Sequence, residues 1–146
     1  MNPALPKTYG GQERKSGVNI AVFCSGNGTN LQAIIDSQKK GHIKADIKLV
    51  VSDTPGSYAI TRAKDAKLRT LVVERDKFSA KKDFETEILQ ALKKENIGLI
   101  VLAGYMRIFS GDFISAYENK ILNIHPALLP SFKGAHGISD AFRYGV

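Results

Sequence analysis

The sequence feature that most constrains the fold is a regular alternation of short apolar runs with segments of helical periodicity. The apolar runs, rich in β-branched residues, predict strands at residues 18–24, 47–52, 69–73, 97–103 and 121–125. Apolar side chains spaced three or four residues apart predict helices at residues 31–41, 58–67, 79–95, 112–117 and 138–144. Such strand–helix units favour an α/β fold, a mostly parallel, twisted sheet with helices on both faces.

Three of these segments carry sharper expectations. Residues 97–103, Ile-Gly-Leu-Ile-Val-Leu-Ala, form the most apolar run, as expected of a strand covered on both faces. Ser79 is expected to cap the third helix, and Gly145 to close the last one. The buried stripe of the third helix is predicted to consist of Phe84, Ile88, Leu89 and Leu92.

Length and composition indicate one soluble domain. A chain of 146 residues can bury one sizeable core, which we place at residues 18–146, whereas the polar, Pro- and Gly-interrupted residues 1–17 predict a flexible N-terminal extension. No apolar run approaches the roughly 20 residues that span a bilayer, and no signal peptide is visible. We therefore expect a cytoplasmic protein with no membrane partner, whose single cysteine, Cys24, is a small core residue.

The charge of the chain suits anionic ligands. Lys and Arg outnumber Asp and Glu by 21 to 14, a net charge of +7, which fits phosphate-bearing or polycarboxylate ligands and also a nucleic-acid surface. The basic residues are spread over many elements, with neither an arginine-rich run nor an aromatic RNA-binding motif. We therefore expect small-molecule partners and no nucleic acid.

A glycine-rich turn, Ser25-Gly-Asn-Gly-Thr-Asn30, follows the first predicted strand and opens a helix, where backbone N–H groups form an anion site. It is not a Walker loop, because no Gly-Lys-Ser/Thr follows. Gly26-x-Gly28 resembles half of a dinucleotide fingerprint, with Asp53 placed as a ribose-binding acid, but Leu31 occupies the third glycine position. The remaining interpretations are a monophosphate site with donors from Thr29 and Asn30, or a simple glycine turn.

The last predicted strand contains an amide and an imidazole. Alternation along a strand puts Asn123 and His125 on one face and sends Leu122 and Ile124 into the core. Pro126 ends the strand, which leaves both polar groups at its carboxyl end, the edge where parallel sheets bind ligands. The alternative is that the two side chains merely cap the strand.

Three motifs in order resemble the phosphoribosylglycinamide formyltransferase family, the folate-dependent enzymes of purine synthesis. They are Ser25-Gly-Asn-Gly-Thr-Asn-Leu-Gln, Ala103-Gly-Tyr-Met-Arg-Ile and Asn123-Ile-His-Pro-Ala-Leu-Leu-Pro-Ser-Phe. The similarity covers residues 18–146. It implies a Rossmann-like formyltransferase fold and formyl transfer from 10-formyltetrahydrofolate to the amine of glycinamide ribonucleotide, without a metal.

The resemblance also implies site residues. Those matching the segment that binds the ribonucleotide phosphate are Gly28, Thr29 and Asn30. Those matching the loop that cradles the pterin are Met106, Arg107, Ile108 and Phe109, to which the folate site adds Asn123. Lys81 falls where the family can carry an arginine that contacts the folate, a departure because an ammonium group does not reproduce a planar guanidinium.

Asn123 and His125 match the catalytic pair of the family. An amide N–H of Asn123 can donate to the oxyanion that develops on the formyl oxygen, and a protonated His125 can stabilise the same charge and act as a general acid. The formyltetrahydrofolate hydrolases and the methionyl-tRNA formyltransferases share this Asn-x-His arrangement and remain alternatives. The phosphate turn favours the small phosphorylated acceptor.

In the family, an aspartate on a later strand tunes the histidine, and this sequence stops before that strand. We therefore expect the domain at residues 18–146 to lack its C-terminal strands. Either the sequence is part of a longer enzyme, or the 146 residues alone are not a competent transferase. The role of His136 and the oligomeric state are not readable from the sequence.

Overall fold

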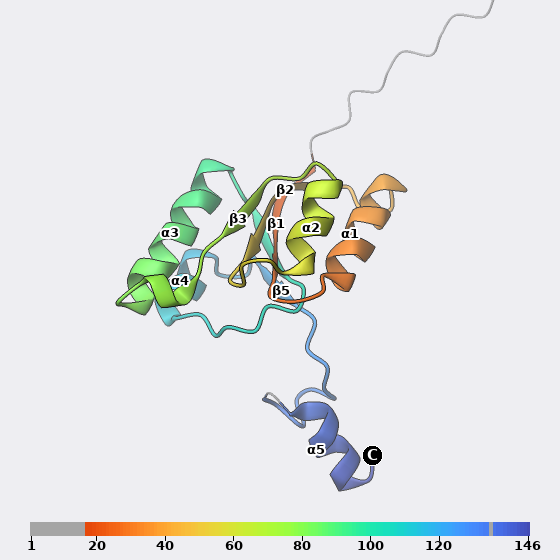
Figure 1. Cartoon of the computed structure of the whole chain (residues 1–146). Coiled ribbons are helices and arrows are strands. Elements are labelled where there is room, and N and C mark those ends of the chain that lie inside the picture. The colour runs from red at the N-terminus through yellow and green to blue at the C-terminus, as the bar shows by residue number, and fades with distance from the viewer. Residues whose placement is uncertain (1–16, 135) are drawn as a thin grey trace, which may run out of the picture.

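The computed structural model describes residues 17–134 and 136–146, so the predicted extension lies almost entirely outside the described residues. The strands are β1 (Asn19–Cys24), β2 (Asp46–Ser52), β3 (Thr70–Val72), β4 (Leu99–Leu102) and β5 (Ile121–Asn123) (Figure 1). The helices are α1 (Thr29–Lys39), α2 (Tyr58–Asp65), the 3-10 turn η1 (Arg75–Lys77), α3 (Lys81–Lys94), α4 (Gly111–Ala116) and α5 (Gly137–Tyr144).

All strand pairs are parallel, in the order β3-β2-β1-β4-β5. The α/β fold predicted from the strand–helix alternation is thus confirmed. The chain builds outward from β1 to β2 and β3, and then crosses back to β4 and β5 on the other side. The carboxyl ends of β1 and β4 therefore form the topological switch point, where open parallel sheets bind ligands.

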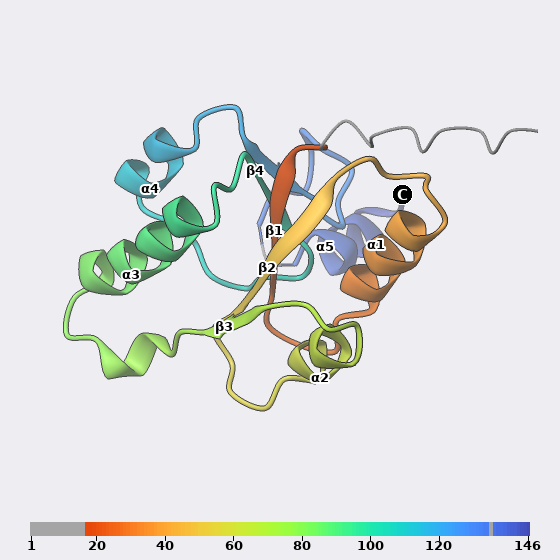
Figure 2. The ribbon, with the colours of Figure 1, turned by 90° about the horizontal axis from the view of Figure 1, so that it is seen from above.

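Two apolar layers sandwich the sheet because alternate residues of β1 face opposite ways. Phe23 packs with Ile88 of α3 and Phe113 of α4 on one face. Val22 packs on the other face, in the cluster that contains Leu31 of α1 and Ala63 of α2. Figure 2 shows α3 and α4 on one side of the strands and α1 and α2 on the other. These four helices cover both faces of the strands whose ends form the switch point.

One of the two local expectations for α3 and β4 is wrong. The N-cap of α3 is Ala80, without a side-chain cap, so the predicted cap at Ser79 is wrong by one residue. β4 is covered on both faces, as predicted: Ile100 and Leu102 pack into one core cluster and Leu99 and Val101 pack against the other, although only Ile100 is fully buried.

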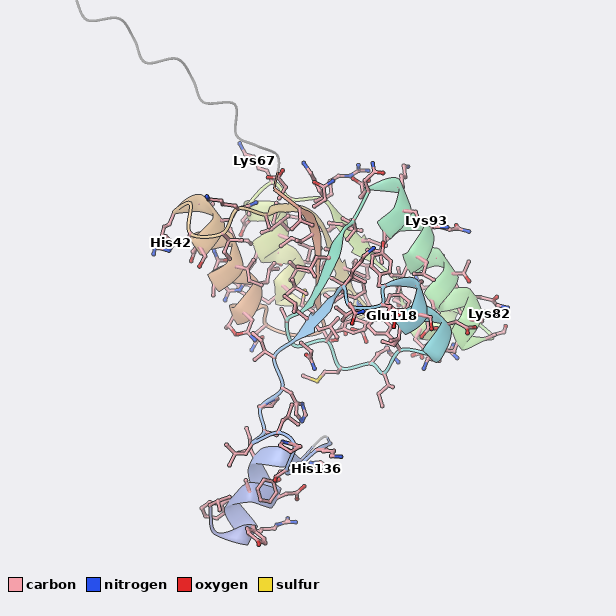
Figure 3. The ribbon with its side chains drawn as sticks, turned by 180° about the vertical axis from the view of Figure 1, so that it is seen from behind. His42, Lys67, Lys82, Lys93, Glu118 and His136 are labelled. Atoms are coloured by element: carbon pink, nitrogen blue, oxygen red, sulfur yellow. The ribbon has the colours of Figure 1, made fainter. Side chains whose placement is uncertain are left out.

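The end of the chain departs most from expectation. β5 stops at Asn123, and the predicted core residues Leu122 and Ile124 are 57% and 66% exposed. That prediction is wrong because β5 is an edge strand and, of its residues, only Ile121 packs against a core cluster. In Figures 1 and 3 the chain leaves β5 for α5, which stands clear of the other helices. The helix itself is confirmed, closed by Gly145 with a φ of 89°.

Cys24 is fully buried at the end of β1, as predicted. Burial, followed by the nearby carboxylate of Asp53, raises the pKa of its thiol to about 11. Among the described residues, no helix combines the length and apolar character needed to cross a membrane. Residues 17–134 and 136–146 contain no group of three or more His, Cys, Asp or Glu side chains placed to hold a metal ion.

Candidate functional site

The turn at residues 25–30, called here the phosphate turn, joins β1 to α1. Gly28 is the N-cap of α1 and has a φ of 68°, a left-handed conformation that favours glycine. A Cβ atom at this position would lie 2.7 Å from both Cα and Cβ of Ala59 in α2. Gly28 therefore lets α2 pack closely against the turn, and the exposed Thr29 and Asn30 begin the helix beside it.

Helix α2 braces the phosphate turn from behind. The backbone N–H of Ala59 donates to the carbonyl oxygen of Gly26 at 3.1 Å. Arg62 donates through Nε to the carbonyl oxygen of Asn27 at 2.9 Å, and through Nη1 to Oε1 of Gln32 at 3.3 Å. Sequence analysis missed Arg62, because its only signal is a basic residue on a helix whose contact with the turn depends on the fold. Its guanidinium adds positive charge beside the predicted anion site.

A cavity of about 250 Å³ opens between the phosphate turn and the chain that follows β4. It is lined by Ser25, Gly26, Asn27, Gly28, Thr29, Asn30, Ala103, Gly104 and Met106. Two hydrogen bonds tie its walls together: the backbone N–H of Ser25 donates to the carbonyl oxygen of Gly104 at 3.1 Å, and that of Met106 donates to Oγ of Ser25 at 3.0 Å. The structure thus brings together two motifs that are far apart in the sequence.

A second cavity, of about 340 Å³, lies on the other side of Met106. Its lining combines basic and apolar side chains: Arg75, Lys81, Phe84, Met106, Arg107 and Ile108. Lys81 is therefore brought to the predicted folate loop, while Arg75 was missed by sequence analysis because it lies in the short turn η1. Met106 and Ile108 are 80% and 86% exposed, so their apolar side chains are available to a ligand.

Phe109, the last residue of the predicted folate loop, faces inward instead. Its ring stacks on that of Phe113, with centroids 3.9 Å apart, and meets the ring of Phe23 edge-on. It is part of the core layer between the sheet and α4. Only its backbone is therefore offered to a ligand, in keeping with a loop expected to act largely through apolar and backbone contacts.

Arg107 turns back toward the sheet. Its Nε atom lies 2.6 Å from Oδ2 of Asp53, which follows β2 and is only 8% exposed. A buried carboxylate is stable as an anion only when it is paired, so this contact accounts for Asp53 without a ligand. The dinucleotide interpretation loses its ribose-binding acid, because the Asp53 carboxylate is already engaged.

Neither Asn123 nor His125 is among the lining residues of either cavity. Asn123, exposed, is the last residue of β5 and pairs in register with Leu102, so it lies at the carboxyl edge as predicted. His125 is half-buried in the following loop rather than in the strand. In Figure 3, His42 lies beyond the end of α1 and His136 lies at α5, well apart from each other.

Comparison with known proteins adds to this geometry. A family described as formyl transferase matches residues 18–146. The phosphoribosylglycinamide formyltransferase of Bacillus subtilis is 40% identical over 127 residues, which cover 87% of this chain and 65% of that protein. The trifunctional purine biosynthetic protein adenosine-3 of Gallus gallus is 42% identical over 136 residues, 93% of this chain and 14% of that protein.

Solved structures agree. Glycinamide ribonucleotide transformylase 1 from Geobacillus kaustophilus superposes with a TM-score of 0.86 at 46% identity, covering 89% of this chain and 69% of that one. The chain thus spans 65% of its relative from Bacillus subtilis and 14% of the chicken protein. The family match over residues 18–146, together with this close structural likeness, shows that the chain belongs to the formyl transferase family, among the phosphoribosylglycinamide formyltransferases.

Proposed function

We propose that this chain binds glycinamide ribonucleotide and 10-formyltetrahydrofolate and transfers the formyl group between them, a step of purine biosynthesis. The observation that carries the proposal is the cavity of about 250 Å³ whose walls are the phosphate turn and the start of the folate loop. A formyl transfer needs its two substrates side by side, and this cavity joins the two predicted binding segments.

The phosphate of the ribonucleotide would bind at the start of α1. The first backbone N–H groups of a helix lack intrahelical acceptors, and the helix dipole favours an anion there. The side chains of Thr29 and Asn30 supply further donors. The hydrogen bond from Arg62 to the Asn27 carbonyl holds a positively charged guanidinium beside the turn. The acceptor amine would then point from this end toward the switch point.

The folate would lie along the loop on the other side of Met106. The exposed side chains of Met106 and Ile108 offer apolar contacts to a pterin ring. Lys81 and Arg75 line the same cavity and offer positive charge to the carboxylates of a folate. Backbone amides would thus bind the phosphate of one substrate, and apolar side chains would bind the pterin ring of the other.

The chemistry would fall to Asn123 and His125. The acceptor amine attacks the formyl carbon, a new C–N bond forms, and the bond from that carbon to N10 of the folate breaks. Charge collects on the formyl oxygen, where the Asn123 amide can donate a hydrogen bond. His125 as an imidazolium can stabilise the same charge and supply the proton that N10 needs, while the attacking amine releases one. We expect small-molecule partners, no nucleic acid, and a cytoplasmic location.

The proposal is tested by a matched pair of histidine variants. Formyl transfer is measured from the appearance of tetrahydrofolate, in wild type, His125→Ala and His42→Ala. We expect His125→Ala to lose more than a hundredfold in kcat with an unchanged melting temperature, and His42→Ala, a change at an exposed histidine, to retain wild-type turnover. Retained turnover in His125→Ala would remove that residue from the mechanism.

A second measurement addresses binding alone. Calorimetric titration with glycinamide ribonucleotide should show an affinity that falls at least tenfold in Gly28→Ala. Binding of NAD in place of the ribonucleotide would overturn the proposal in favour of a dinucleotide module.

A further inference from the structure

The predicted folate loop, residues 106–109, is flanked by Tyr105 and Ser110, and from here on the name folate loop covers the whole segment 105–110. Tyr105 and Phe109 are packed against the core cluster, with ring centroids 5.3 Å apart, and Arg107 reaches inward to Asp53. Between them, Met106 and Ile108 are almost fully exposed. Two packed aromatic rings and the pair between Arg107 and Asp53 therefore hold the loop, while Met106 and Ile108 are presented to a ligand.

The inward side of this loop meets two buried carboxylates. Asp53 is 8% exposed and pairs with Nε of Arg107 at 2.6 Å. Glu85 of α3 is 4% exposed and accepts hydrogen bonds from both the backbone N–H of Ser110, at 2.8 Å, and its hydroxyl. One carboxylate thus fixes the middle of the loop and the other fixes its end, at the N-cap of α4.

We propose that Asp53 and Glu85 are positioning residues that together fix the folate loop in the shape that presents Met106 and Ile108 to the pterin. This inference rests on the proposed function for the identity of the ligand. Neither carboxylate belongs to the three motifs that resemble the formyltransferase family, and each acts through a residue of the loop. Without them the loop would retain its two aromatic anchors but lose its polar ones.

The energetics favour this role over a purely structural one. An ion pair with one buried partner gains little net stability over apolar packing, yet removal of one partner leaves an uncompensated charge. Lys81 lies 3.8 Å from Oε1 of Glu85, too far to replace the two Ser110 contacts. Charged anchors at two points on a short exposed loop restrict its conformations.

Tyr105, the first residue of the loop, lies close enough to Asp53 and Glu85 for both carboxylates to affect its pKa. Its hydroxyl is buried and has no hydrogen-bond partner within the described part of the chain. Burial first, and then the Asp53 carboxylate, raise the pKa of this phenol; Arg107 lowers it in part, and Glu85 adds a smaller rise. The phenol therefore stays neutral, and in the described part of the chain it makes no hydrogen bond to either carboxylate.

The test compares Asp53→Asn with Asp46→Asn, an aspartate at the opposite end of β2 whose side chain is 48% exposed. Hydrogen exchange of the loop amides is followed by mass spectrometry in the full chain. We expect exchange at residues 105–110 to speed up at least tenfold in Asp53→Asn and in Glu85→Gln, and to stay unchanged in Asp46→Asn. Unchanged loop exchange in both buried-site variants would overturn the proposal.

Calorimetry on the same proteins compares the Kd values of two ligands. A general loss of stability would weaken both, whereas a loss of loop position should weaken only folic acid. The Kd for folic acid should rise about fivefold or more in Asp53→Asn, while the Kd for glycinamide ribonucleotide stays within about twofold of wild type. Equal weakening of both ligands would overturn the positioning role. Faster loop exchange in a protein whose wild type binds no folate would support the anchors and reject the proposed folate site.

If Asp53→Asn fails to fold, Arg107→Gln removes the same ion pair from its more exposed partner. This variant is read by loop exchange alone, because Arg107 also lines the folate cavity. The double variant Asp53→Asn/Arg107→Gln should exchange no faster than either single variant, because both remove one interaction. Additive effects on loop exchange would show that the two residues act separately and would overturn the pairing.

Discussion

The switch point between β1 and β4 and the segment from β5 to α5 are built in opposite ways. At the switch point, Phe23 and Cys24 at the end of β1 are fully buried, and hydrogen bonds connect the phosphate turn to the folate loop and to α2. In the other segment, most large apolar side chains are exposed: Leu122, Ile124, Leu128, Leu129, Ile138, Phe142, Tyr144 and Val146.

The contrast shows what positions each half of the proposed site. The two binding segments are held by tertiary contacts with helices on both faces of the sheet, so their geometry depends on the packing of the whole domain. The segment that carries His125 and α5 relies on local contacts, such as the edge-on packing of Phe132 and Tyr144 with ring centroids 5.6 Å apart. Segments with few buried contacts open at low free-energy cost. We therefore expect binding and catalytic residues to differ in rigidity.

The largest test of this contrast removes one phenylalanine from each region. Phe23→Ala should lower the free energy of unfolding by about 3–5 kcal/mol, because it leaves a cavity between the sheet and the rings of Tyr105 and Phe109. Phe142→Ala, at a side chain 83% exposed, should change it by less than about 0.5 kcal/mol. Urea denaturation measures both, and comparable losses would erase the distinction between the two regions.

The next test acts on the phosphate turn. Gly28→Ala should cost about 2–4 kcal/mol, since the new Cβ meets Ala59 at 2.7 Å and the residue must keep a φ of 68°. Gly26→Ala is the matched control, because a Cβ there meets nothing within 4 Å. Thermal unfolding of both variants gives the comparison. Similar losses would mean that the close approach of α2 does not constrain the turn.

A smaller effect is expected at the end of the folate loop. The hydroxyl of Ser110 accepts from the backbone N–H of Phe113 at 3.2 Å and also donates to Glu85. Ser110→Ala should therefore cost about 1–2 kcal/mol in chemical denaturation. Ser139→Ala, at an exposed serine in the first turn of α5, should cost less than about 0.5 kcal/mol. Equal costs would indicate that both helix starts are held alike.

The same contrast explains how far the sequence could predict the molecule. Periodicity is a local property, so it predicted the strands and helices to within a few residues and the sheet class from their alternation. The phosphate turn was predictable because glycines and small polar residues at a helix start have a local meaning. The exposure of Leu122 and Ile124 was not, because apolar alternation indicates a buried face without revealing whether anything covers it.

The polar contacts that support the site could not be predicted from the sequence, for another reason. Asp53 and Arg107 are 54 residues apart, and Glu85 and Ser110 are 25 apart. Each residue alone is an ordinary charged or polar side chain, and only the crossover from β3 to β4 brings their elements together. The strand order that decides this pairing is not written in any single segment. Arg62 behind the phosphate turn was missed for the same reason.

The smallest predicted effect tests the burial of the switch point through Cys24. The folded state holds the pKa of its thiol at about 11, above the ordinary value of 9.0. As pH rises through this interval the unfolded chain loses the proton first, so the free energy of unfolding should fall, by about 1 kcal/mol at pH 10. Well below pH 9 the thiol is protonated in both states, so this group should give the free energy of unfolding no dependence on pH there. Urea denaturation at pH 8 and pH 10 measures the difference.

Cys24→Ala isolates the contribution of the thiol from that of other alkaline groups. The variant should lose about 1 kcal/mol less than wild type between pH 8 and pH 10, because it has no proton to release on unfolding. Native wild type should also resist alkylation by iodoacetamide at pH 8.5, since the thiolate is the reactive form. Equal alkaline losses in both proteins, or rapid native alkylation, would show that the end of β1 opens as readily as the exposed segment does, and the rigid half of the comparison would fail.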